Sequence, residues 1–149
     1  MLRSRLPLLN LAGTERQRVV RIFLVEDNPM MREQLRAVLE KQHDWKVVGE
    51  AEDGRHAIEG WKKHAPSLTV MDFLLPGMSG LEAGKNLSMQ HPESPILMVT
   101  IDPSPQLEEE AKKAGIKGLV QKSDVKSLLK AIEILLSGGT YFRQRLAAA

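Results

Sequence analysis

The sequence predicts an α/β protein in which a parallel β-sheet is covered by helices on both faces. Short apolar segments alternate five times with longer segments whose apolar residues have helical spacing, and this alternation is typical of βα units. The strand segments are apolar almost throughout, as expected when both faces of a parallel sheet are buried. With 149 residues, of which 42% are hydrophobic and 27% charged, the chain has the size and composition of one soluble domain.

The five predicted strands are rich in valine, isoleucine and leucine, and turn-forming residues lie at their ends. Pro66 ends the segment before the third strand, and Pro95 directly precedes the fourth. The third strand stops before Asp72, because aspartate is unfavourable inside a strand and tolerated where a strand ends. The strands are expected at residues 19–25, 45–51, 68–71, 96–100 and 118–121.

The five predicted helices follow the strands and carry their apolar residues on one face. Asn28 and Pro29 supply an N-cap and a first-turn proline for the first helix. Pro92 ends the third helix, and Ser123 with Asp124 caps the last. The helices are expected at about residues 29–42, 55–63, 80–90, 105–113 and 125–136.

The positive charge of the chain is concentrated near its N-terminus. Residues 1–21 carry five arginines and one glutamate, whereas the remaining residues carry 16 basic and 18 acidic side chains. We therefore divide the chain into a basic N-terminal extension (1–18), one domain (19–138) and a C-terminal tail or start of a linker (139–149). The extension is expected to be solvated or to contact a partner. The mildly acidic domain argues against direct nucleic-acid binding, which needs a basic surface.

Composition excludes several classes of function. The chain has no cysteine, which excludes disulfides, thiol catalysis and cysteine-ligated zinc and fits a reducing cytosol. Its four histidines have no metal-ligand spacing. No segment approaches the ~20 apolar residues of a membrane span, and the N-terminus has no convincing signal peptide. We therefore expect a cytoplasmic protein that does not enter a membrane.

Reactive side chains follow four of the five predicted strands. Glu26 and Asp27 follow the first strand, and Asp72 follows the third. Thr100 ends the fourth strand, and Lys122 follows the fifth. Each has a plain structural interpretation when taken alone, as a turn residue, a strand-end hydroxyl or a solvated lysine. Because the carboxyl ends of parallel strands meet at one edge of a sheet, however, we expect all five side chains to converge.

This set of side chains suits phosphoryl transfer to a carboxylate. Three carboxylates in one pocket would repel each other unless a cation lay among them, and oxygen ligands of this kind favour Mg²⁺. A divalent cation beside Asp72 would also offset the charge that develops when its carboxylate attacks a phosphoryl group. Lys122 would neutralise one oxygen of the added group, and Thr100 would donate a hydrogen bond to another.

Four short motifs contain these residues: Val25-Glu26-Asp27-Asn28-Pro29, Val70-Met71-Asp72-Phe73-Leu74-Leu75-Pro76-Gly77-Met78-Ser79-Gly80, Val99-Thr100 and Gln121-Lys122. Together they resemble the motifs of the receiver domains of two-component response regulators, and the resemblance covers roughly residues 19–138. It implies a CheY-like, flavodoxin-like (βα)5 three-layer sandwich with a five-stranded parallel sheet of order 2-1-3-4-5.

The resemblance also implies a role for each residue of the site. Asp72 would be the phosphoacceptor, and Thr100 and Lys122 would be the switch hydroxyl and the phosphoryl-binding lysine. The implied Mg²⁺ ligands are Glu26, Asp27, Asp72 and the backbone carbonyl of Leu74. A sensor histidine kinase would supply the phosphoryl group. The chain itself would be no enzyme beyond intrinsic phosphotransfer and autodephosphorylation.

The end of the predicted domain resembles receivers that precede a LuxR/NarL-type helix-turn-helix domain. The resemblance lies in the last helix and in Gly138-Gly139-Thr140-Tyr141-Phe142. Few residues follow, so we expect either a stand-alone receiver or the receiver part of a transcription regulator. A homodimer would use the surface of residues 105–113, 118–121 and 125–136, or the surface of residues 29–42 and 125–136.

The chain departs from the family pattern at three positions. Leu119 replaces the usual switch aromatic, Ile101 replaces a small residue, and Ser123 replaces a proline common among relatives. The first two departures favour an alternative function, a phosphorylation-independent protein-interaction module on the same fold. A hydrolase with an aspartyl-phosphate intermediate is a second alternative, but Leu74 occupies the place of its required second aspartate. Since Leu74 cannot hydrogen-bond a water, self-dephosphorylation is expected to be slow, and Asp102 is the nearby group on which this expectation depends.

Overall fold

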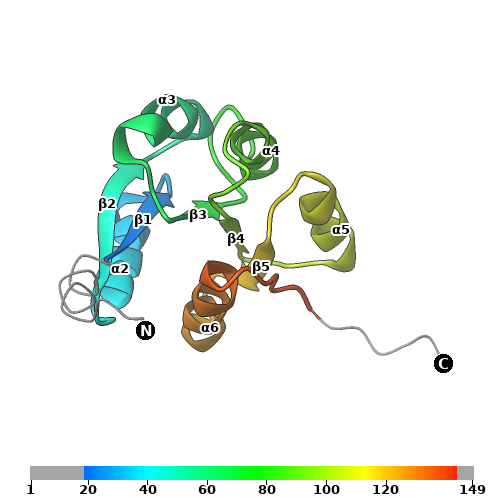
Figure 1. Cartoon of the computed structure of the whole chain (residues 1–149). Coiled ribbons are helices and arrows are strands. Elements are labelled where there is room, and N and C mark those ends of the chain that lie inside the picture. Colours follow the sequence, from blue (N-terminus) through cyan, green and yellow to red (C-terminus); the bar gives the residue numbers. More distant parts are fainter. Residues whose placement is uncertain (1–18, 144–149) are drawn as a thin grey trace, which may run out of the picture.

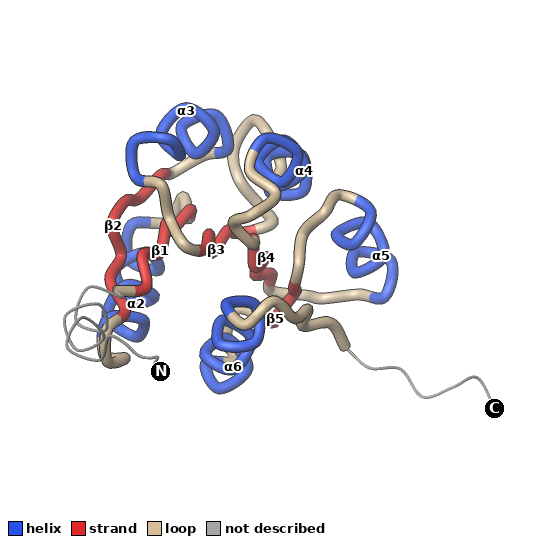
Figure 2. The backbone as a smooth tube through the Cα atoms, viewed as in Figure 1, coloured by secondary structure: helices blue, strands red, loops and turns tan. Residues whose placement is uncertain are grey.

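The computed structural model describes residues 19–143 of the chain. The predicted basic extension and the end of the predicted tail lie outside these residues. Strands and helices alternate along the whole described part, as Figures 1 and 2 show. The elements are β1 (Val20–Val25), α2 (Pro29–Glu40), β2 (Trp45–Ala51), α3 (Gly54–His64), β3 (Leu68–Asp72), α4 (Gly80–Gln90), β4 (Ile96–Thr100), α5 (Pro105–Lys113), β5 (Gly118–Gln121) and α6 (Val125–Leu136).

The five strands form one parallel sheet in the order β2-β1-β3-β4-β5. The predicted fold class and strand order are therefore confirmed. β3 lies at the centre of the sheet, and all five of its residues are buried. Reversal of strand order between β1 and β3 opens a crevice at the carboxyl ends of the strands, where proteins of this architecture bind ligands.

Two apolar layers lie on opposite faces of the sheet. Successive residues of β1 alternate between them, since neighbouring side chains of a strand point to opposite faces. Phe23 and Val25 belong to the layer under α3, α4 and α5, whereas Ile22 and Leu24 belong to the layer over α2 and α6. In Figure 1 the same two groups of helices lie on opposite sides of the sheet.

The predicted element boundaries agree with the structure to within a few residues. The first helix ends at Glu40 instead of about Gln42, because Lys41 already acts as its C-cap. The second helix begins at Gly54 instead of about Arg55, and Asp53 is its N-cap. Asp72 is the last residue of β3 instead of the residue after it. Among residues 19–143, none of the helices combines the length and apolar character needed to cross a bilayer.

Candidate functional site

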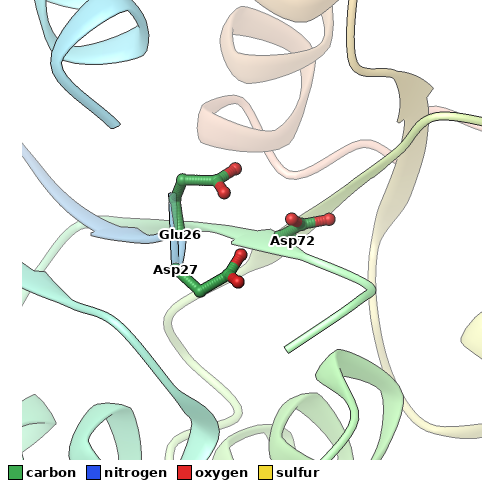
Figure 3. A group of neighbouring side chains, drawn as sticks. All are labelled: Glu26, Asp27 and Asp72. Atoms are coloured by element: carbon green, nitrogen blue, oxygen red, sulfur yellow. The ribbon is translucent and has the colours of Figure 1, made fainter. Parts of the chain in front are cut away.

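Three carboxylates meet at the carboxyl ends of β1 and β3. Val25 pairs with Met71 across these neighbouring parallel strands, so the residues that follow them, Glu26 and Asp72, lie side by side. Asp27 completes the group, and one oxygen from each carboxylate lies within 4.8 Å of the others. Figure 3 shows the three side chains gathered where the two strands end. Glu26 and Asp72 are buried, whereas Asp27 is exposed.

Lys122 binds two of these carboxylates. Its Nζ lies 2.7 Å from Oε1 of Glu26 and 2.8 Å from Oδ2 of Asp72. The backbone N–H of Lys122 donates a 2.7 Å hydrogen bond to the carbonyl of Thr100, which holds the start of the β5–α6 loop against β4. Burial acts to lower the pKa of Lys122, but its contacts with the Asp72 and Glu26 carboxylates outweigh burial and raise this pKa. Lys122 therefore stays protonated and serves as a counter-ion for the acidic group.

Glu26 is held rigidly from several directions. Its Oε2 accepts a 3.0 Å hydrogen bond from the Asn28 N–H, and its backbone carbonyl accepts a 2.7 Å bond from Arg32. Oε1 is buried and has no hydrogen bond of favourable angle within residues 19–143, so its contact with Lys122 is an ion pair. Burial raises the pKa of Glu26, although the contacts with Lys122 and Asn28 oppose this change. A buried carboxylate oxygen without a hydrogen bond is suited to receive a cation.

Both oxygens of the Asp72 carboxylate accept hydrogen bonds. Oδ1 accepts a 3.3 Å hydrogen bond from the Leu74 N–H, and Oδ2 accepts the bond from Lys122. These two contacts fix the carboxylate at the edge of the sheet.

The backbone of Gly80 lies against the backbone of Asp72 and Phe73, a contact that the sequence patterns did not reveal. Its N–H donates a 2.8 Å hydrogen bond to the carbonyl of Phe73, so the start of α4 lies directly on the end of β3. A Cβ atom at Gly80 would collide with the carbonyl oxygen of Asp72. Glycine is therefore required here because two segments of backbone approach each other. From the sequence, Gly80 is expected only as the first residue of a helix.

Thr100 lies one strand away from Asp72, at the end of β4. Asp72 pairs with Val99 in the sheet, so Thr100 is one residue beyond the phosphoacceptor candidate along the neighbouring strand. Its side chain is buried, and its hydroxyl accepts a 3.4 Å hydrogen bond from the Asp102 N–H. All five side chains predicted to converge therefore do lie at one edge of the sheet.

A groove of about 440 Å³ opens beside Lys122. Two large apolar side chains on its walls are mostly exposed, Met30 at 71% and Ile101 at 67%. The groove is lined by Asn28, Met30, Met31, Gln34, Ile101, Gln121, Lys122 and Ser123.

Comparison with known proteins agrees with this geometry. The family model of the response regulator receiver domain matches residues 22–133, and the chain belongs to this family. It is 27% identical over 128 residues to the transcriptional regulatory protein DegU of Brevibacillus brevis, covering 85% of this chain and 54% of DegU. It is 29% identical over 130 residues to the response regulator UvrY of Escherichia coli K12, covering 87% of this chain and 60% of UvrY.

A solved structure has the same fold. The crystal structure of a LuxR-family two-component response regulator from Aurantimonas sp. SI85-9A1 superposes with a TM-score of 0.80 at 35% identity, covering 83% of this chain and 89% of that one. The predicted family and its LuxR/NarL-type relatives are thus confirmed, and the protein contains a receiver domain of two-component signal transduction. Receivers of this family pair with histidine kinases and generally bind Mg²⁺. The chain spans little more than half the length of DegU and UvrY.

Proposed function

We propose that Asp72 is the phosphoacceptor of this receiver and that a sensor histidine kinase is its phosphoryl donor. The observation that supports this most strongly is the position of Asp72, which is 3% exposed, bonded to Lys122 and clustered with Glu26 and Asp27. An oxygen of the Asp72 carboxylate attacks phosphorus. As the new O–P bond forms, the bond from phosphorus to the histidine nitrogen breaks and the imidazole leaves.

The acidic cluster fits the Mg²⁺ that the family generally binds. Three carboxylates within 4.8 Å of one another are hard oxygen ligands of the type that Mg²⁺ prefers. We propose that Glu26, Asp27, Asp72 and the backbone carbonyl of Leu74 hold the ion. When bound, Mg²⁺ supplies positive charge that stabilises the phosphoryl oxygens during transfer. Among residues 19–143, Lys122 is the cation that forms ion pairs with Glu26 and Asp72.

Thr100 and Lys122 are proposed to respond to the added phosphoryl group. The Thr100 hydroxyl accepts a bond from the Asp102 N–H, and we propose that it turns toward Asp72 to donate its proton to a phosphoryl oxygen, which would break that bond. Lys122 already contacts Asp72 at 2.8 Å and would transfer a hydrogen bond from the carboxylate to the phosphoryl oxygen. Both changes alter the loops that lead into α5 and α6, and thereby the surface that a partner recognises.

The groove beside Lys122 is proposed to be the contact surface of the kinase. The groove is lined by Lys122, which contacts Asp72, and by the exposed Met30 and Ile101, to which a kinase that presents its phosphohistidine to Asp72 would bind. We also propose that a homodimer would use either the surface of α5, β5 and α6 or the surface of α2 and α6.

Hydrolysis of the aspartyl phosphate is expected to be slow. The side chain of Leu74 is mostly exposed next to Asp72 and has no group that could orient an attacking water. Asp102 is an exposed acid at the same edge of the sheet, and it is the side chain on which this expectation depends. A lifetime of the phosphorylated protein of only seconds, measured by mass spectrometry after removal of the donor, would contradict this expectation.

Incubation with acetyl phosphate and Mg²⁺, followed by intact mass measurement, tests the proposal. We expect one added phosphoryl group on the wild type and on Asp102→Asn, which changes an exposed acid at the same edge. Asp72→Asn keeps the size of the side chain and should show none. An unmodified wild type, or a modified Asp72→Asn variant, would overturn the proposal.

A second candidate function is partner binding without phosphorylation. Leu119, where the family usually has an aromatic switch residue, is 4% exposed and belongs to the core under α5. A buried aliphatic residue cannot swing between inward and outward positions as an exposed aromatic residue does. This candidate predicts partner affinity that beryllofluoride, a phosphoryl mimic, leaves unchanged.

A further inference from the structure

The segment that follows α6 lies along the outer edge of the sheet. The Leu119 N–H donates a 3.0 Å hydrogen bond to the carbonyl of Tyr141, and the Tyr141 N–H donates a 2.9 Å bond to the carbonyl of Lys117. Tyr141 and Gly118 form a parallel bridge. β5 is the last strand of the sheet, so these residues pair with backbone groups that an edge strand otherwise leaves open. We call residues 141–143 the terminal segment.

The terminal segment is also fastened to α5. The N–H of Arg143 donates a 2.5 Å hydrogen bond to Oε2 of Glu108, a side chain in the first turn of α5 that is 4% exposed. Phe142 packs against the core layer under α5, and the ammonium of Lys112 lies 5.2 Å from the centre of its ring. A buried carboxylate is costly unless it is hydrogen-bonded. Glu108 therefore favours the position in which the terminal segment is docked.

These contacts connect α5 and β5, two elements that lie next along the chain to residues of the proposed phosphorylation site. α5 follows Thr100 after a loop of four residues, and Lys122 directly follows β5. Leu119, which holds Tyr141, stands three residues before Lys122. The terminal segment thus joins β5 to α5 through its bonds with Leu119 and Glu108. Figure 1 shows it as the red trace beside β5.

We propose that the terminal segment clamps α5 to β5 in the unphosphorylated protein and is released when Asp72 carries a phosphoryl group. This inference rests on the proposed function. In the present arrangement the Thr100 hydroxyl bonds to the β4–α5 loop. Its rotation toward a phosphoryl oxygen removes that bond and lets α5 shift relative to β5. Contacts that tie α5 to β5 oppose such a shift, so the clamp and the phosphoryl group favour different states.

The coupling between occupancy of the phosphorylation site and docking of the terminal segment can be measured in both directions. If occupancy of the site weakens docking of the terminal segment, then weakening the dock must strengthen occupancy by the same factor. A useful probe of occupancy is beryllofluoride with Mg²⁺. A useful probe of docking is hydrogen exchange at the Tyr141 and Leu119 amides, because both donate bonds between the segment and β5.

The experiment uses the full chain and residue-resolved amide exchange by NMR. We expect beryllofluoride with Mg²⁺ to accelerate exchange of the Tyr141 amide by about fivefold or more, while the amide of Val70 in the central strand is unaffected. Glu108→Ala should accelerate exchange at Tyr141 without beryllofluoride and should lower the half-saturating beryllofluoride concentration. Tyr141→Pro removes one hydrogen-bond donor at the edge of the sheet and should also lower the half-saturating beryllofluoride concentration. This variant replaces Glu108→Ala if Glu108→Ala fails to fold. Glu110→Ala removes an exposed charge from the same helix and should change neither quantity.

The outcomes separate this inference from the function on which it rests. If beryllofluoride binds, as shown by shifts near Asp72 and Thr100, and exchange at Tyr141 is unchanged or slower, the clamp is overturned and the phosphoacceptor proposal stands. If no beryllofluoride binds to the wild type, both proposals are overturned. Unchanged beryllofluoride affinity in Tyr141→Pro would likewise contradict the clamp.

Discussion

The two halves of the site differ in how firmly their residues are fixed. On the side of β1 and β3, Glu26 and Asp72 are buried, and hydrogen bonds from backbone and side chains fix both carboxylates. On the side of β4 and β5, Thr100 makes a longer bond of 3.4 Å to its own loop, and Ile101 is mostly exposed. On the proposed function, the first half would carry out the chemistry and the second half would move in response to it.

The largest expected effect comes from removing the acids of the first half. In Asp27→Ala or Glu26→Ala, a carboxylate of the proposed Mg²⁺ site is lost. Phosphorylation by acetyl phosphate at a fixed Mg²⁺ concentration should slow by about 100-fold, measured as phosphorylated fraction against time by intact mass. Glu52→Ala, a change at an exposed acid in the loop after β2, should have little effect. Equal rates in all variants would refute this division of the site.

Gly80→Ala should disturb the first half through the backbone. The added methyl group meets the Asp72 carbonyl oxygen, so the end of β3 or the start of α4 must move. We expect a loss of about 3 kcal/mol in the free energy of unfolding, measured by urea denaturation.

Gly60→Ala is the matched control for that change. A methyl group there would lie 3.9 Å from Phe23, which is an ordinary contact, and alanine is the better helix former. This variant should gain about 0.5–1 kcal/mol. A similar loss in both variants would show that the close approach at Gly80 has no special cost.

Lys122→Met tests the ion pairs that join the two halves. The change leaves Glu26 and Asp72 close together without their cation and should cost about 1–3 kcal/mol at neutral pH. Because the folded protein raises the pKa of Lys122, the stabilisation is fully present below the ordinary lysine value of 10.5. It is lost as pH rises through the higher pKa of the folded state.

Urea denaturation of wild type and Lys122→Met as a function of pH measures this effect. The difference between the two proteins should be constant from neutral pH to about 10 and should shrink above 10.5. A difference that grows with pH in the alkaline range would contradict the assignment of Lys122 as a charged partner of the two carboxylates.

The smallest expected effect concerns the exposed wall of the second half. Ile101→Ala removes a large side chain beside the groove and should raise the rate of phosphorylation by acetyl phosphate about threefold, which is under 1 kcal/mol of activation free energy. Met89→Ala removes another exposed apolar side chain far along α4 and should leave the rate unchanged. A slower rate in Ile101→Ala would indicate that this side chain assists binding of the donor.

The fold was predictable because strand and helix patterns in this sequence are strong and agree with each other. β4 and β5 have the predicted bounds, since apolar β-branched runs between prolines and glycines leave few alternatives. The convergence of Asp72 and Lys122 followed from topology alone, because parallel strands end at the same edge. The roles of these residues stay proposals.

Contacts between segments without a local pattern were not predictable. The close approach of Gly80 to the Asp72 carbonyl depends on the exact path of the loop between β3 and α4. The bond from Arg143 to Glu108 joins residues that are 35 positions apart, and nothing in the spacing of the acids on α5 distinguishes Glu108 from its neighbours. Such contacts arise from packing, which a single sequence shows only indirectly.

The most direct test of the account locates the phosphoryl group on the chain. Treatment of the phosphorylated protein with borohydride reduces an aspartyl phosphate to the alcohol, and peptide mass spectrometry then identifies the altered residue. We predict homoserine at position 72 only, and only after incubation with Mg²⁺. Modification at Asp27 or Asp102 instead, or modification at position 72 that does not depend on Mg²⁺, would contradict it.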